Sequence, residues 1–133
     1  MQPYKIVIIK HDYFEFITVA GIRYACYFLS YAEYFKAYKE VAENIYSYNI
    51  EVLEGQRTIG AFDERAGFTI VEIVKRFLEG LEQAVVYVCD TSDGRELLRK
   101  RKFDGWFRKY DDGTIIKGMD IFRFRILHFI MLS

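Results

Sequence analysis

A cysteine and an aspartate lie where an apolar segment meets a predicted helix. Cys89 and Asp90 close the run QAVVYVCD, and a thiol at a helix N-terminus can have its pKa lowered far enough to act as a nucleophile. Such a nucleophile also needs a base, and the chain holds only His11 and His128, neither near it in sequence. The apolar run favours a buried structural thiol, so we expect no catalytic residue here.

The same segment contains two carboxylates that could help to ligate a cation. Asp90 and Asp93 would need a third ligand from elsewhere in the chain. Asp93 also precedes Glu96 at the spacing of a helix capping box. We favour the cap, and we expect no metal site.

Residues 95–109 form a basic segment, with seven basic and two acidic residues. In a nucleic-acid complex, the cations Arg95, Arg99 and Arg101 could bind phosphates while the ring of Trp106 stacks on a base. Alternatively, the aromatic rings belong to the core and the cations to a solvated face. We prefer the second interpretation and expect no nucleic-acid partner, because the net charge is +0 and the pI about 6.7. Residues 33–82, with ten acidic and six basic residues, offer this segment an acidic surface on a second copy.

The composition is that of one globular domain covering residues 1–133. Of these residues 52% are hydrophobic and 18% aromatic, which allows a sizeable core. The N-terminus lacks the features of a signal peptide, and the apolar runs are too short to span a bilayer. We therefore expect a cytoplasmic protein that does not contact membranes, with Cys26 and Cys89 reduced and buried.

Alternation and turn signals predict the order of the elements. Three strands over residues 4–10, 13–19 and 22–29 precede a helix over 31–45 and a strand over 46–52. A glycine-containing loop over 54–68 then leads to a helix that Thr69 caps and Gly80 ends. The remainder is predicted as a buried strand over 83–89, a helix over 94–110, and strand segments over 114–117 and 120–132.

This order, βββαβαβαβ, predicts an α+β fold in which helices pack on a mostly antiparallel sheet. The helix between the strands over 46–52 and 83–89 acts as a crossover, so these two strands could be parallel neighbours. The apolar end, residues 127–133, is either an inner strand or a strand that pairs with another chain.

Two resemblances to known families add to this interpretation. The pattern Cys89-Asp90-x-x-Asp93-Gly94-Arg95, continued by Arg99-x-Arg101-x-Phe103-x-x-Trp106-Phe107, resembles an uncharacterised family of small Bacteroidetes-type bacterial proteins. The likeness covers roughly residues 4–107 and implies no activity or ligand.

The order of elements is similar to the core of GCN5-related acetyltransferases. In that family a Gln/Arg-x-x-Gly-x-Gly/Ala loop wraps the pyrophosphate of acetyl-CoA, and the resemblance puts Arg57 and Gly60 in this role. Phe62 stands where the family has a small residue, so we expect no cofactor.

The sequence thus predicts a non-catalytic binding or protein-interaction module. We expect it to form a homodimer or to bind another protein. Two alternatives stay open: a divergent acyl-CoA-dependent transferase, and nucleic-acid binding through residues 95–109.

Overall fold

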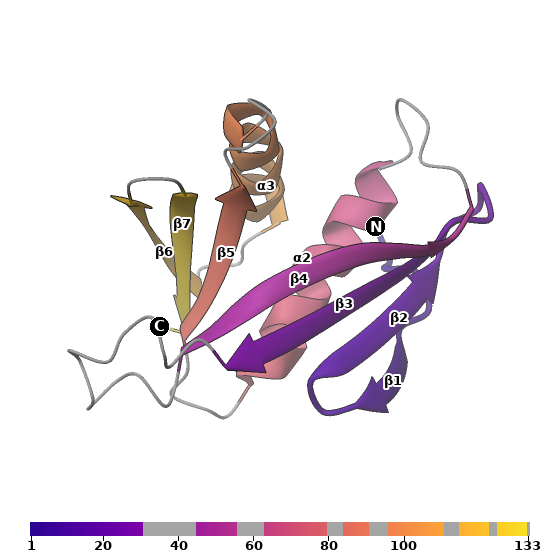
Figure 1. Ribbon diagram of the computed structural model, residues 1–133. Helices are drawn as coiled ribbons and strands as arrows, with labels where there is room; N and C mark the ends of the chain where they lie inside the picture. Colours follow the sequence, from indigo (N-terminus) through magenta and orange to yellow (C-terminus); the bar gives the residue numbers. More distant parts are fainter. Residues whose placement is uncertain are drawn as a thin grey trace.

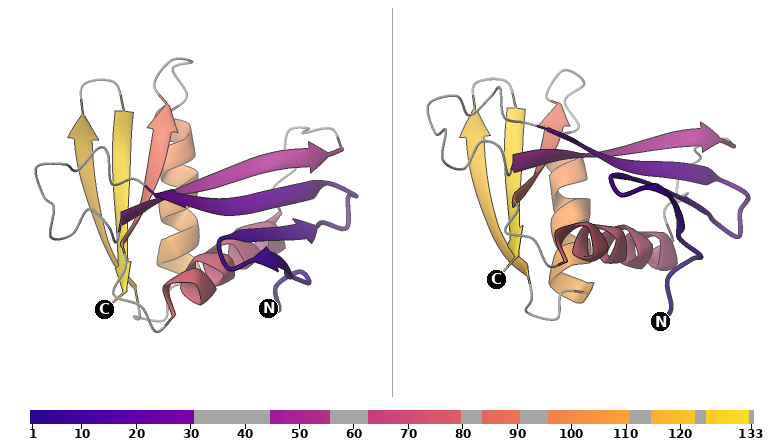
Figure 2. Two further views of the ribbon diagram at one scale, coloured as in Figure 1. Left: turned by 60° about the horizontal axis from the view of Figure 1, so that its bottom comes forward. Right: turned by 90° about the horizontal axis from the view of Figure 1, so that it is seen from below.

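The structure, a computed structural model, describes residues 1–30, 45–55, 63–79, 84–90, 96–110, 115–122 and 125–132. Seven strands form one sheet in the order β1-β2-β3-β4-β5-β7-β6, and the two helices of the described residues lie on the same side of it (Figure 1, Figure 2). The fold is α+β, as predicted. The strands are β1 (Val7–Lys10), β2 (Tyr13–Ile17), β3 (Arg23–Ser30), β4 (Ile45–Glu54), β5 (Ala84–Asp90), β6 (Ile115–Phe122) and β7 (Arg125–Leu132), and the helices are α2 (Glu64–Leu78) and α3 (Glu96–Tyr110).

Strands β1 to β3 form an antiparallel meander, as the turn signals predicted, and β4 extends it by pairing antiparallel with β3. Gly21 makes the turn between β2 and β3 with φ +81°, a conformation that a side chain rarely adopts. Thr18 closes the turn, because its backbone N–H donates to the Ile22 carbonyl at 2.9 Å. Strand β1 is shorter than the predicted 4–10 segment, since Tyr4 binds α2 instead of β2.

Strands β4 and β5 are parallel neighbours, as the crossover predicted, and every other pairing in the described sheet is antiparallel. Strand β5 lies between β4 and β7, and Val85 and Val86 are both fully buried although their side chains point to opposite faces. The apolar run of β5 therefore belongs to the centre of the sheet.

The chain ends in a hairpin, not in the single strand of the predicted order. Within β6, Gly118 pairs with Phe129 of β7. Strand β6 therefore continues through this glycine instead of ending at residue 117 as predicted. Strand β7 lies between β5 and β6. The apolar C-terminal segment is thus an inner strand, which decides between the two interpretations of residues 127–133.

The start of α2 differs from the prediction. Asp63 is the N-cap, and its Oδ1 accepts a hydrogen bond from the Ala66 amide at 2.6 Å. Thr69 lies in the second turn, where its hydroxyl donates to the Arg65 carbonyl. The predicted loop over 54–68 is therefore helical from Glu64 onward, and its residues 56–62 lie outside the described part.

Aromatic rings dominate the core between the sheet and α2. Phe28 stacks on Phe77 of α2 with ring centroids 3.8 Å apart, and Tyr48 stacks on Phe28 with centroids 4.9 Å apart. The Tyr48 hydroxyl donates to the Ile70 carbonyl at 3.2 Å, which satisfies its polar tip inside the core. The high aromatic content thus serves packing in this part of the chain.

Three expectations lie outside the described residues. These are the helix over residues 31–44, the cap at Asp93 and the end of the α2 helix at Gly80. Ile45, the last residue of the predicted helix, instead begins β4.

Candidate functional site

The sequence-predicted site residues do not converge on one described site. Cys89 and Asp90 end β5, where their backbones pair with Ile126 and Arg125 of β7, and Arg99 lies in α3. The side chains of these three residues lie outside the described part, as do the whole residues Arg57, Gly60, Asp93 and Arg95. Only Arg101 and Trp106 have described side chains, and both belong to α3.

Trp106 packs against α2. A Cβ built on Gly67 would lie 2.5 Å from Cδ1 and Nε1 of the Trp106 ring, so the indole occupies the space that a side chain at 67 would need. The Lys102 ammonium lies 5.7 Å from the centre of the same ring. Trp106 therefore joins the two helices, as the core interpretation of this residue proposed.

The face of α3 around Gly105, next to the Trp106 side, is basic and exposed. Arg101, Lys102, Arg108 and Lys109 surround Gly105, which has open space where a side chain would be. Lys109 forms a hydrogen-bonded ion pair with Glu64 of α2, and that hydrogen bond raises the pKa of Lys109. The basic side chains of α3 are therefore solvated, and at the C-terminal end of the helix Lys109 links α3 to α2.

The N-terminus of α2 is occupied by the chain's own groups. The Tyr4 hydroxyl donates to Asp63 Oδ2 at 2.5 Å, while Oδ1 accepts from the Ala66 amide. Arg65 donates to the Gln2 and Pro3 carbonyls, and its guanidinium lies 4.3 Å from the centre of the Tyr4 ring. A helix N-terminus can bind a phosphate, but here a carboxylate already stands in that place.

The parallel strands β4 and β5 separate toward their carboxyl ends. They pair only from Ile45 to Tyr48 and from Ala84 to Tyr87. Beyond that point β4 continues with β3, and β5 continues with β7, so the two strands diverge in Figure 1. Ligands of open α/β sheets often bind where neighbouring parallel strands diverge at their carboxyl ends.

The described cysteine side chain is not suited to nucleophilic chemistry. Cys26 is fully buried on β3, and burial raises its pKa from 9.0 to about 12, although a hydrogen bond with Tyr48 opposes the shift. A thiol with this pKa is protonated near neutrality, and only the thiolate is reactive. The expectation of a reduced, buried cysteine is confirmed for Cys26.

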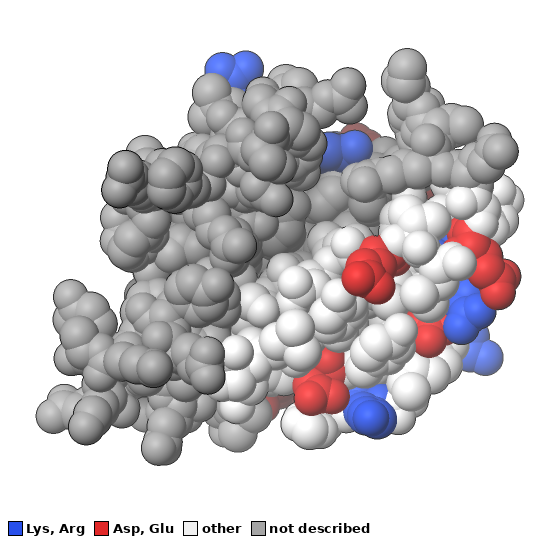
Figure 3. Space-filling model, in the orientation of Figure 1, with Lys and Arg blue, Asp and Glu red and all other residues white. Residues whose placement is uncertain are grey.

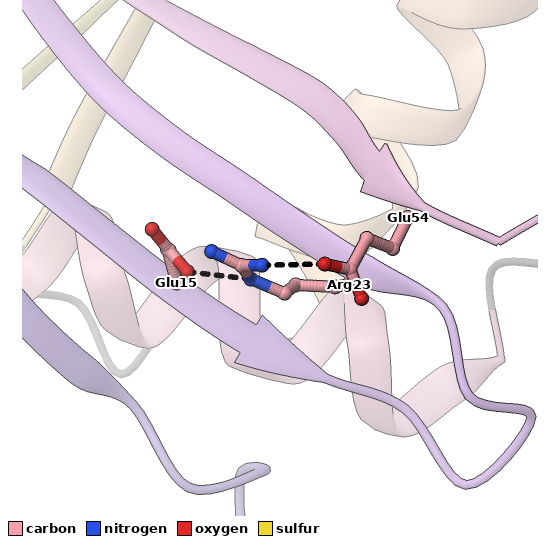
Figure 4. Close-up of polar contacts among 3 residues, drawn as sticks. All are labelled: Glu15, Arg23 and Glu54. Carbon is pink, nitrogen blue, oxygen red and sulfur yellow. Dashed lines mark hydrogen bonds and ion pairs between the residues drawn. The ribbon is translucent and has the colours of Figure 1, made fainter.

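The outer face of the sheet, turned away from α2 and α3, has a charged ladder across β2, β3 and β4. Arg23 donates to Glu15 at 2.7 Å and to Glu54 at 2.9 Å (Figure 4). Tyr27 donates to Glu51 at 2.9 Å, and its ring stacks on Tyr13. Figure 3 shows this side of the molecule, where acidic and basic groups lie among uncharged ones. These polar groups satisfy one another.

The longest run of exposed apolar side chains among the described residues lies on β1, the edge strand next to β2. Val7, Ile8 and Ile9 form most of β1, and they are 44%, 60% and 52% exposed. Ile17 and Val19, at the end of β2 and just beyond it, are 58% and 83% exposed. Strand β1 is an edge of the sheet, so its outward backbone groups have no strand to pair with among the described residues.

Sequence reasoning overlooked β1 as a surface. The run KIVIIK was predicted only as a strand, and pairing with another chain was considered only for the apolar C-terminus, as one of two interpretations. The two lysines that flank four consecutive aliphatic residues are the available signal, since edge strands often carry lysine.

Within the described residues, no group of three or more His, Cys, Asp or Glu side chains could hold a metal ion. Neither described helix has the length and apolarity needed to cross a membrane.

The pattern from Cys89 to Phe107, on which the resemblance to an uncharacterised family rests, begins at the end of β5 and continues into α3. Residues 62–125 match a family of unknown function, DUF6169. The resemblance to an uncharacterised family is thus confirmed over this segment. The DUF6169 segment includes Cys89, Asp90, Arg101 and Trp106, but β1 to β4 precede it. No curated protein and no solved structure matches the chain.

Proposed function

We propose that this chain is a non-catalytic protein-interaction module that binds a partner strand along the outward edge of β1. The observation that carries the proposal is the exposure of Val7, Ile8 and Ile9 on an edge strand. Strand addition uses the backbone groups of such an edge, and flanking apolar side chains supply the contact area. Exposed apolar patches on soluble domains commonly mark interaction sites.

The other described surfaces offer less to a partner. Arg23 is already paired with Glu15 and Glu54, and Trp106 packs against Gly67 of α2. Asp63 and Tyr4 serve the cap of α2, which leaves them a structural role. An interaction through β1 leaves all of these contacts intact.

A photo-reactive amino acid in place of Ile8 tests the proposal in cells that express the full chain. We expect irradiation to link position 8 covalently to a partner protein, because the partner strand would lie within contact distance. The matched control is the same amino acid in place of Leu29, which is 55% exposed on β3. Adducts should form at 8 and not at 29, and a Val7→Lys change should abolish them. Equal labelling at both positions, or none at 8, would refute the proposal.

A second candidate is an acyl-CoA-dependent transferase. The divergence of β4 from β5 favours it, since ligands of parallel sheets bind at such places. The described elements also follow the order on which the acetyltransferase resemblance rests: β4, α2, β5 and α3 in succession. Asp63 opposes it, because its carboxylate would repel a pyrophosphate at the start of α2.

Thermal unfolding with and without acetyl-CoA separates the two candidates. A ligand that binds the folded chain raises the unfolding temperature increasingly as its concentration exceeds Kd. The interaction proposal predicts no shift for the native chain or for Gly60→Trp. A concentration-dependent shift that Gly60→Trp removes would establish the transferase candidate instead.

A further inference from the structure

We propose that the basic face of α3 binds the phosphate backbone of B-form DNA, with α3 in the major groove and without reading the base sequence. We call this surface the cationic face. It consists of Arg101, Lys102, Gly105, Arg108 and Lys109, all of which are exposed. The inference goes beyond the proposed function, because it assigns a second surface of the molecule to a nucleic acid.

The four cations of this face stand in two rows. Successive helix residues are about 100° apart around the axis, so residues seven apart lie nearly in line. Arg101 and Arg108 therefore form one row of α3, and Lys102 and Lys109 form a second row about 100° from it. The two residues of each row are about 10.5 Å apart along the axis. The positive charge thus follows two lines along the helix.

Gly105 lies midway between the two rows, about 50° from each. It is exposed, and nothing lies within 4 Å of the place that a Cβ would take. Asp104 is the one acidic residue of the sequence 101–110, and its position is about 100° from Gly105, outside the two rows. The cationic face therefore has an open centre line between long cationic side chains.

This arrangement matches the major groove of B-form DNA. The groove is about 12 Å wide and admits an α-helix between the phosphates of its two strands. Each row of cations would contact phosphates of one strand, while the backbone at Gly105 approaches the floor of the groove. The release of counterions from these phosphates supplies the affinity. A-form RNA is a poorer match, because its major groove is too narrow for a helix.

The described aromatic rings of α3 are engaged in packing, so they do not serve as a platform for bases. Trp106 fills the space beside Gly67, Phe107 is 2% exposed, and the Tyr110 ring packs on Phe68 with centroids 5.1 Å apart. Single-stranded nucleic acids are held largely by stacking on such rings, and protein interfaces are built around buried aromatic or aliphatic anchors. The five residues of the cationic face offer charge alone, which favours a duplex backbone.

The distribution of charge makes this site compatible with a net charge of +0 for the whole chain. Residues 95–109 include seven basic and two acidic residues. At physiological salt, screening limits the influence of exposed charges to about 8 Å, so a ligand at α3 responds mainly to nearby groups. With four described cations to contact phosphates, we expect weak binding that depends strongly on salt.

One contact within the chain competes with DNA. Lys109 is paired with Glu64 of α2, and the two side chains are 55% and 66% exposed. Exposed ion pairs of this kind are weak, so a phosphate can replace the carboxylate. Glu64→Gln removes the competing anion and should strengthen DNA binding about two- to threefold. A substitution that merely damaged the fold would not strengthen binding.

Fluorescence anisotropy of a short DNA duplex of arbitrary sequence tests the site with the purified full chain. We expect binding at about 50 mM salt that weakens steeply toward about 200 mM, with a slope of log affinity against log salt of about −3 to −4. Arg108→Ala should make this slope shallower by about 1, because it removes one phosphate contact.

Arg76→Ala is the matched control, because Arg76 and Arg108 are both exposed arginines in the last turn of a helix. Arg76 lies half a turn around α2 from Gly67, the residue that meets α3. Its removal changes the net charge by the same amount, yet it should alter neither the affinity nor the slope. Equal effects of the two substitutions would reduce the binding to net charge and overturn the inference.

Three other polyanions define the ligand. Single-stranded DNA, double-stranded RNA and poly-glutamate should each bind at least about tenfold more weakly than the duplex. Equal binding of poly-glutamate would assign the cationic face to acidic protein segments, and equal binding of either other nucleic acid would show that α3 does not enter a B-form groove. Each of these results would overturn the inference. A native chain that does not bind the duplex at about 50 mM salt, or a Glu64→Gln variant that binds it no more tightly, would overturn it as well.

Discussion

At the scale of single residues, the structure gives Cys26 a packing role. Its side chain is fully excluded from solvent, in the core cluster that also holds Tyr24, Phe28 and Tyr48. In a Cys89→Ser background, we expect Cys26 to resist a soluble thiol reagent until the chain unfolds, because burial keeps the thiol both protonated and inaccessible. The measurement is the labelling rate with and without urea. Rapid labelling of the native chain would contradict the buried position of Cys26.

Tyr27 should make the fold weaker in alkaline solution. Burial, and then the hydrogen bond to Glu51, raise the pKa of Tyr27 from 10.0 to about 12. Between these two values the unfolded chain loses the phenolic proton and the folded chain keeps it, so the free energy of unfolding falls as pH rises. The fall should be small, because Tyr27 is half-buried and water screens its contacts.

Urea denaturation measures the free energy of unfolding of the native chain and of Tyr27→Phe, each at one pH below 10.0 and at one pH near 12. The variant should lose less stability over that interval. Cys26 titrates in the same direction in both proteins, so its effect cancels in the comparison. An identical loss in both proteins would remove Tyr27 from the explanation.

At the scale of elements, α2 and α3 meet through Gly67. Inside a helix, alanine is more favourable than glycine by about 1 kcal/mol. At position 67, however, the alanine Cβ would lie 2.5 Å from the Trp106 ring. We expect the clash to prevail, so Gly67→Ala should lower the free energy of unfolding by about 1–2 kcal/mol. Chemical denaturation measures this difference.

Gly105→Ala is the matched control, because Gly105 lies in α3 with nothing within 4 Å of the position that a Cβ would take. It should raise the free energy of unfolding by roughly 0.5–1 kcal/mol. Equal effects of the two substitutions would mean that Trp106 does not pack on Gly67.

The cap of α2 also fastens the N-terminal segment. Asp63→Ala removes the cap and the hydrogen bond from Tyr4, and it should lower the free energy of unfolding by about 2–3 kcal/mol. Tyr4→Phe removes only the second contact. In a double-mutant cycle by chemical denaturation, the two changes should couple by about 0.5 kcal/mol or more. Fully additive effects would show that Tyr4 and Asp63 act separately.

Much of this element order was predictable, and the exceptions have physical reasons. The β-branched run of β5 and the alternation in β4 predicted a buried and a half-buried strand, because burial on two faces or one face imposes these patterns. The start of α2 was placed too late, with the cap at Thr69 instead of Asp63. Gly67 suggested a loop. The structure explains the glycine differently: the Trp106 ring, from a helix distant in sequence, occupies the space that a side chain at position 67 would need.

At the scale of the whole molecule, strand order decides which apolar segments are exposed. Residues 127–132 and residues 6–9 are similarly apolar in sequence, yet β7 is an inner strand and β1 is an edge. Apart from the lysines that flank residues 6–9, no local pattern distinguishes the two, since strand order depends on pairings between distant segments. The sequence therefore contained only this weak signal for the candidate interaction edge, whereas it predicted the α+β class.

Amide hydrogen exchange at β1 tests the central claim most directly. In an isolated chain, the β1 amides that point away from β2 are open to solvent, while strand addition would hydrogen-bond them. We predict that these amides of Val7–Lys10 exchange quickly in the isolated chain and slowly in the complex purified after cross-linking at position 8. Equally fast exchange in the isolated chain and in the complex would contradict strand addition at β1.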